Sequence, residues 1–111
     1  MLQLRDQLLK TERRAWVRYS CAQEAEVRPD PAATVVFRKA IIHSISRKGL
    51  GILLNTAVDV GTILKVGLQG FNWSRLLLAR VVRVSAQPDG WYHGCELANI
   101  LTEDEVEEIL A

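Results

Sequence analysis

Short apolar runs separated by turn residues recur along most of the chain. Residues 62–69 show the pattern most clearly, because Leu64, Val66 and Leu68 alternate with polar or small residues, as expected for a β-strand that buries one face. Further strands are predicted at 19–27, 34–45, 50–55, 74–85 and 91–97, of which 34–45 is rich in β-branched residues. Five or six short strands joined by tight turns predict a mainly β protein, an antiparallel barrel or sandwich rather than βαβ units.

Proline and glycine mark the predicted strand boundaries. Residues 28–31, Arg-Pro-Asp-Pro, are expected to end the first strand, because proline has no backbone N–H to donate to a sheet. Residues 86–90, Ala-Gln-Pro-Asp-Gly, predict a tight turn before the last strand. Residues 102–110 predict a helix, since Thr102 and Glu105 form a capping box. The weaker periodicity of residues 2–10 predicts a short helix.

The composition fits one domain with a modest core, since the chain has 111 residues of which 49% are apolar. The net charge of +1 gives no support to a polymer of nucleic acid as the partner. Five of the 13 acidic residues lie at 103–108, so the remainder of the chain is basic and can attract a small anion. No apolar run approaches the length of a membrane span, and the first ten residues lack the pattern of a secretion signal. We therefore expect a cytoplasmic protein without membrane insertion.

The sequence offers little for catalysis or metal binding. Cys21 and Cys95 lack the spacing of a metal site or a redox pair, so we expect buried free thiols, with a disulfide as the alternative. His93 has no companion at ligand spacing and is interpreted as a strand residue. No paired carboxylates, catalytic triad order or phosphate-binding loop stands out. Neither an enzyme nor a metal site is predicted.

Arginines are concentrated just before the first strand, at Arg13, Arg14 and Arg18. Guanidinium groups are planar forks that suit phosphate oxygens and the O6 and N7 edge of guanine. Two of them on a short segment can converge on one ligand that offers both groups. The alternative is a set of surface arginines in salt bridges. Trp16, between them, is expected to pack this segment against the barrel rather than to stack on a base.

A second polar segment, residues 43–49, follows the second predicted strand. Ser44 and Ser46 are two residues apart, so on an extended backbone their hydroxyls face the same side. Gly49 allows a turn that other residues resist and lets a ligand approach the backbone. The alternative is an ordinary polar turn. His43 is expected to face the opposite side from Ser44.

Together, the R-x-x-x-R of residues 14–18 and the S-x-S-x-x-G of residues 44–49 resemble the PilZ domain family. The sequence LLLARVVRVS and the final WYHGCELANILTEDEVEEIL are also similar to that family. The resemblance implies one domain over 1–111, a six-stranded antiparallel PilZ-type β-barrel with a C-terminal α-helix. Its expected parts are an N-terminal extension (1–12), the arginine segment (13–18), the barrel (19–98) and the helix (102–110).

The resemblance also implies a bacterial receptor for the second messenger cyclic di-GMP, with no enzyme activity and no cofactor. The arginine segment would close over the ligand and change the surface shown to a downstream protein partner. An intercalated pair of ligands is a hypothesis that the extra arginine supports. The implied ligand-binding residues are Arg13, Arg14, Arg18, Ser44, Ser46 and Gly49.

Ser44 departs from the family pattern, which has Asp or Asn at this position. A carboxylate or amide reaches further and can pair with guanine N1 and N2, whereas serine has one short hydroxyl. Losing one such contact weakens binding by roughly ten- to a hundredfold. A degenerate PilZ domain that only contacts proteins is therefore the alternative. An oligonucleotide-binding barrel is a further alternative, but it would need aromatic rings spread along the strand faces.

Overall fold

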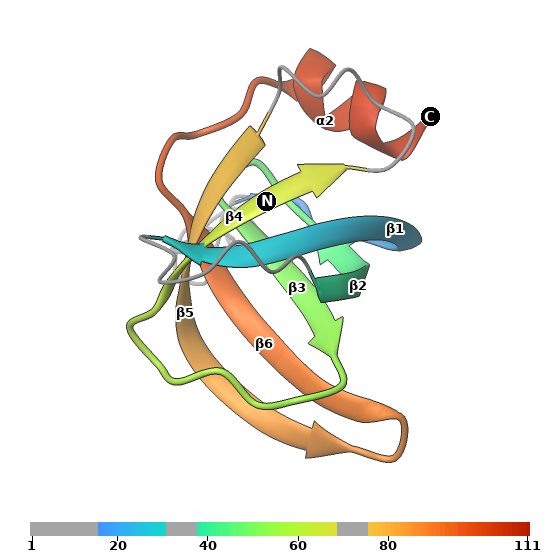
Figure 1. Ribbon diagram of the computed structural model, residues 1–111. Helices are drawn as coiled ribbons and strands as arrows, with labels where there is room; N and C mark the ends of the chain where they lie inside the picture. The colour runs from blue at the N-terminus through green and yellow to red at the C-terminus, as the bar shows by residue number, and fades with distance from the viewer. Residues whose placement is uncertain (1–15, 31–37, 69–75) are drawn as a thin grey trace, which may run out of the picture.

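The computed structural model describes residues 16–30, 38–68 and 76–111. The elements are β1 (Tyr19–Asp30), β2 (Arg38–Ile45), β3 (Gly49–Leu54), β4 (Ile63–Leu68), β5 (Leu76–Gln87), β6 (Gly90–Leu97) and α2 (Glu103–Leu110). All strand pairs are antiparallel, and the order β1-β2-β3-β6-β5-β4 closes through pairing of β4 with β1. The predicted six-stranded antiparallel barrel with a C-terminal helix is confirmed (Figure 1). The helix predicted at 2–10 lies outside the described residues.

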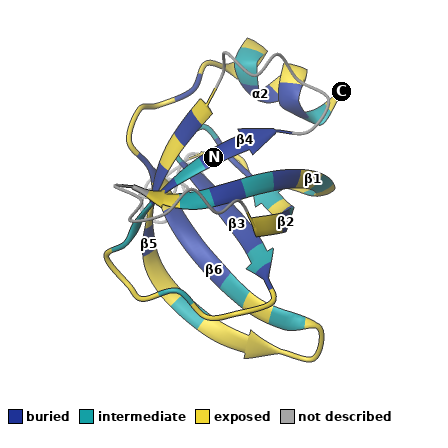
Figure 2. Cartoon of the chain, viewed as in Figure 1, coloured by how far each residue is buried: buried dark blue, intermediate teal, exposed yellow. Residues whose placement is uncertain are grey.

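The barrel interior is filled by apolar side chains that alternate along the strands. In β4, Leu64, Val66 and Leu68 are all buried, as the alternation predicts. Helix α2 covers one end of the barrel, and the β5–β6 hairpin projects at the other end (Figure 1). Val106 and Ile109 of α2 belong to the same buried cluster as the strand residues. In Figure 2, dark blue marks the buried residues of α2 and yellow marks the exposed residues near the tip of the hairpin.

Helix α2 begins with the predicted capping box. Thr102 Oγ1 accepts a hydrogen bond from the Glu105 N–H at 3.0 Å, and Glu105 Oε1 accepts one from the Thr102 N–H at 2.8 Å. These two bonds satisfy backbone donors that an uncapped helix leaves without partners. Leu101, just before the cap, is buried in the core. The short helix is thus fixed by its cap and by its apolar side.

The first strand is longer than predicted. Strand β1 ends at Asp30, inside the predicted boundary segment 28–31, but it continues past the predicted last residue, 27, and through Pro29. Pro29 is the partner of Leu64 in β4, and the described partners of residues 28–30 all lie on β4. Proline is tolerated in a strand at a position where its missing N–H is not needed for pairing. The turn predicted between β5 and β6 is confirmed at residues 88 and 89.

Both cysteines are free thiols, as predicted. Cys95 is buried, whereas Cys21 is only half-buried and donates through Sγ to the Ile42 carbonyl at 3.3 Å. Within the described ranges, no three His, Cys, Asp or Glu residues are placed to hold a metal ion. None of the helices that the structure describes is long and apolar enough to cross a membrane.

Candidate functional site

The two sequence motifs meet at Arg18 and Ser44. Arg18 lies immediately before β1, and the register pairs Ser20 of β1 with Ser44 of β2. This register brings the arginine segment alongside Ser44, and Arg18 Nη1 donates a hydrogen bond to Ser44 Oγ at 3.1 Å. The two groups are 26 residues apart in the sequence. The strand pairing therefore places a guanidinium fork beside the serine motif, where both are exposed or half-buried.

Ser46 lies just after β2 and shapes the turn into β3. Its Oγ accepts hydrogen bonds from the backbone N–H groups of Lys48 at 3.3 Å and Gly49 at 3.1 Å. The Ser46 N–H in turn donates to the Gly49 carbonyl at 2.9 Å. Because Ser46 is only 5% exposed, these bonds give it a role in holding the turn. Its hydroxyl hydrogen remains the group that it can offer to a ligand.

Gly49 is required by close packing rather than by an unusual turn. The expectation of a special backbone conformation there was wrong, since the described glycines with positive φ are Gly61 and Gly90. A Cβ on Gly49 would lie 3.0 Å from the Cys95 carbonyl oxygen and 3.3 Å from Arg18 Nη2. Glycine is thus the residue that lets the Arg18 guanidinium approach the backbone of β3. The group that approaches Gly49 in the structure is this arginine, and the approach of a ligand stays a prediction.

A shallow depression of about 300 Å³ is lined by Arg18, Ser46 and Gly49 among others, whereas Ser44 is not part of its lining. Three other depressions, of about 270, 360 and 420 Å³, contain none of the predicted ligand-binding residues. Size therefore does not single out the site, whereas the chemistry of its lining does. The depression is lined by Trp16, Arg18, Ser46, Lys48, Gly49, Val82, Cys95 and Glu96.

Positive charge dominates the rim of this depression. Arg47 Nε donates to the Leu101 carbonyl at 2.7 Å, and Lys48 Nζ donates to the Leu97 carbonyl at 3.2 Å. The acceptor of each bond is a backbone carbonyl and not a carboxylate. The acidic neighbour Glu96 is already paired with Arg80 at 3.2 Å. Together with Arg18, these cations favour an anionic ligand.

Trp16 contacts the turn rather than the barrel core. The Arg47 guanidinium carbon lies 5.0 Å from the centre of the Trp16 ring, within the range of a cation–π interaction. The Trp16 side chain is 37% exposed. The contact of Trp16 is with the charged side chain of Arg47 in the turn, whereas the expectation was packing against the barrel.

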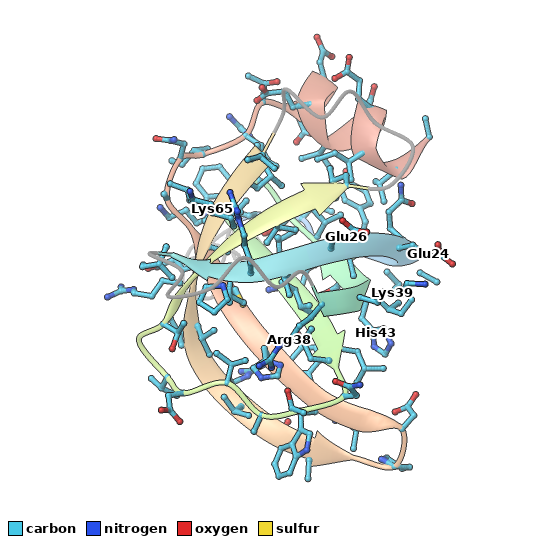
Figure 3. The ribbon with its side chains drawn as sticks, viewed as in Figure 1. Glu24, Glu26, Arg38, Lys39, His43 and Lys65 are labelled. Carbon is cyan, nitrogen blue, oxygen red and sulfur yellow. The ribbon has the colours of Figure 1, made fainter. Side chains whose placement is uncertain are left out.

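Two predicted site residues cannot be placed, since Arg13 and Arg14 lie outside the described residues. His43 is exposed and points outward from β2 (Figure 3). Sequence analysis missed Tyr92 and Arg83, which lie on the same outer face as Ser44. The signal that could have indicated them is a pair of glycines, Gly51 and Gly94, at facing positions of neighbouring strands.

Comparison with known proteins supports one family. The PilZ domain model matches residues 12–111. No curated protein matches the chain. Among solved structures, the Bacillus subtilis inhibitor of motility (MotI/DgrA) is similar, with a TM-score of 0.62 and 17% sequence identity over 87% of this chain. The chain covers 47% of that protein, and at this identity the likeness concerns the fold alone. The barrel, the facing motifs and the match over residues 12–111 lead to one conclusion, that the chain belongs to the PilZ domain family.

Proposed function

We propose that the chain is a receptor domain for cyclic di-GMP that passes the signal to a protein partner and catalyses no reaction. PilZ domains are binding and regulatory domains. The observation that carries the proposal is the hydrogen bond between Arg18 Nη1 and Ser44 Oγ at 3.1 Å. The bond joins one residue of each motif, and this closeness supports the proposal because a single ligand would have to contact both.

The geometry supports a ligand that combines phosphate with guanine. Arg18 uses Nη1 for Ser44, while its Nη2 faces the backbone at Gly49. A guanidinium can bind two phosphate oxygens or the O6 and N7 edge of guanine in a bidentate manner. Cyclic di-GMP contains two of each group. In the proposal, the ligand replaces Ser44 as the partner of Arg18, and Arg13 and Arg14 add contacts from the same segment.

Ligand binding would change the surface around the turn. The Trp16 ring rests on Arg47, and Arg47 is bonded to Leu101 at the start of the C-terminal helix. Closure of the arginine segment over a ligand would shift this group of side chains. We propose that the altered surface is read by a downstream protein, an order–disorder or repacking output of the kind used by many switches.

The test is calorimetric titration with cyclic di-GMP, with GMP and cyclic di-AMP as control ligands. We expect saturable binding to cyclic di-GMP alone, weakened by added salt because guanidinium–phosphate contacts are screened. Arg18→Ala should weaken binding by at least about tenfold, the loss expected for a charge-assisted contact. Arg38→Ala is the matched control. Its guanidinium bonds Thr56 at 2.6 Å, and in Figure 3 it lies away from α2.

The outcomes separate the proposal from its main alternative. No heat with wild-type protein would favour a degenerate domain that contacts proteins without nucleotide. If the Arg14→Ala/Arg18→Ala double variant binds cyclic di-GMP as well as wild type, the chain is still a receptor but the assigned binding site is wrong. A stoichiometry of two ligands per chain would support the intercalated pair, and a stoichiometry of one would exclude it.

A further inference from the structure

The side chain of Tyr92 lies across Gly51, next to the serine that departs from the family pattern. Gly51 in β3 is the register partner of Ser44 in β2. A Cβ on Gly51 would overlap Tyr92 Oη and would lie 2.7 Å from Ser44 Oγ. The phenol oxygen and the serine hydroxyl therefore border the same small space above Gly51. This space opens on the side of the sheet where Arg18 bonds Ser44.

Arg83 and a second glycine hold Tyr92 in this position. Gly94 in β6 is the register partner both of Gly51 and of Arg83 in β5. A Cβ on Gly94 would lie 3.1 Å from Arg83 Cγ, so glycine leaves room for the arginine stem. The Arg83 guanidinium carbon lies 5.9 Å from the centre of the Tyr92 ring. Across the described residues, Arg83 forms no ion pair with an acid.

The result is a continuous polar strip on the outside of the barrel. It runs from Arg18 and Ser44 over the two facing glycines to Tyr92 and Arg83. Side chains from β6 and β5 thus extend the proposed site beyond the two sequence motifs. The two glycines are buried beneath Tyr92 and the stem of Arg83, so a planar base on this strip would meet these side chains rather than the backbone.

The chemistry of the phenol fits the contact that Ser44 lacks. Guanine presents N1–H and N2–H donors that a carboxylate or amide at position 44 would accept. The serine hydroxyl is too short to reach as far, whereas a phenol oxygen is a competent acceptor. We infer that Tyr92, reaching across Gly51, supplies the guanine-edge contact that Ser44 is too short to make. This inference rests on the proposed binding of cyclic di-GMP.

The experiment is a double-variant cycle measured by calorimetric titration with cyclic di-GMP. Tyr92→Phe removes only the phenol oxygen and should weaken binding by about tenfold, the loss expected for one hydrogen bond to a buried ligand edge. Ser44→Asp restores a longer acceptor and should tighten binding. In the Ser44→Asp background, Tyr92→Phe should weaken binding by less than about threefold, since the contact is then supplied twice.

Two further variants serve as controls. Tyr19→Phe makes the same chemical change in a side chain that packs against the core, and it should leave affinity unchanged. Gly51→Ala keeps the phenol but displaces it, because the added Cβ would overlap Tyr92 Oη. Gly51→Ala should therefore weaken binding as Tyr92→Phe does. Thermal unfolding of each variant confirms that the protein titrated is folded.

The outcomes are separable from those of the proposed function. If wild-type protein gives no heat, the receptor proposal fails and the role of Tyr92 fails with it. If wild-type protein binds and Tyr92→Phe binds equally well, the receptor stands and the inference is overturned. The inference is also overturned if Tyr92→Phe weakens the binding of cyclic di-GMP equally in the wild-type and the Ser44→Asp backgrounds. In that case Tyr92 would not be replacing the missing acceptor.

Discussion

Arg47 and Leu101 are joined by two hydrogen bonds, and each residue donates one of them. The Leu101 N–H donates to the Arg47 carbonyl at 2.8 Å, and Arg47 Nε donates to the Leu101 carbonyl at 2.7 Å. Arg47 belongs to the turn that carries the serine motif, whereas Leu101 immediately precedes the helix cap at Thr102. These two bonds tie the proposed ligand site to the C-terminal helix. A change in one is therefore expected to affect the other.

Replacing Arg47 tests the strength of this connection. Arg47→Met keeps the aliphatic stem but leaves the Leu101 carbonyl without its side-chain donor. We expect the free energy of unfolding to fall by about 1–2 kcal/mol, the usual effect of a lost hydrogen bond to a half-buried group. Urea denaturation measures the change. Arg80→Met is the matched control, because the exposed Arg80–Glu96 pair is expected to contribute less than about 1 kcal/mol.

Much of the fold follows from local sequence features. The alternation around Leu64, Val66 and Leu68 and the capping box at Thr102 predict elements that the structure confirms. Local rules explain these cases because each depends on residues within a few positions. The extension of β1 through Pro29 could not be predicted in this way, since it depends on which neighbour the strand pairs with.

The same distinction between local features and long-range contacts applies to the candidate site. Motif spacing indicated Arg18 and Ser44, and the strand register brings them into contact. The positions of Tyr92 over Gly51 and of Trp16 over Arg47 depend on residues distant in sequence. No periodicity within one segment reports such contacts. They become visible only when the register of neighbouring strands is known.

Replacing Gly49 provides a second test, because the structure indicates that glycine is needed there for close packing and not for its backbone angle. Gly49→Ala would place a Cβ 3.0 Å from the Cys95 carbonyl oxygen and 3.3 Å from Arg18 Nη2. We expect a loss of about 1–3 kcal/mol in stability from overpacking. Ligand affinity should also fall, since Arg18 must move. Denaturation and calorimetric titration measure the two effects.

Gly61→Ala is the corresponding control. Gly61 has a φ of 97°, and an added Cβ there would meet no atom within 4 Å. Backbone strain alone should reduce its stability by about 1–3 kcal/mol, with no change in ligand affinity. Equal effects of the two alanines on affinity would contradict the packing role of Gly49.

The helix cap makes a third prediction. Thr102→Ala removes the oxygen that accepts the Glu105 N–H at 3.0 Å. We expect the free energy of unfolding to fall by about 1 kcal/mol. Thr102→Ser keeps the hydroxyl and should retain most of that stability. Thermal or urea denaturation of both variants measures the contribution, and a Thr102→Ser protein as unstable as Thr102→Ala would show that the methyl group matters instead.

His93 makes stability depend on pH. The side chain is fully buried in β6, and its Nε2 accepts a hydrogen bond from the Val58 N–H at 2.9 Å. Burial lowers the pKa of His93 below its ordinary value of 6.5. As pH falls through 6.5, the unfolded chain takes up a proton that the folded chain does not. Stability from this residue is therefore complete above that pH and decreases below it, until the lower folded pKa is reached.

The decrease can reach about 1.4 kcal/mol per pH unit within that interval. Urea denaturation at pH 7.5, 6.5 and 5.5 measures it. His93→Gln keeps an acceptor that can reach the Val58 N–H but does not titrate, so its stability should fall less steeply than that of wild type. The other titrating groups are common to wild type and His93→Gln, so a wild-type slope equal to that of His93→Gln would mean that His93 is not kept neutral by the fold.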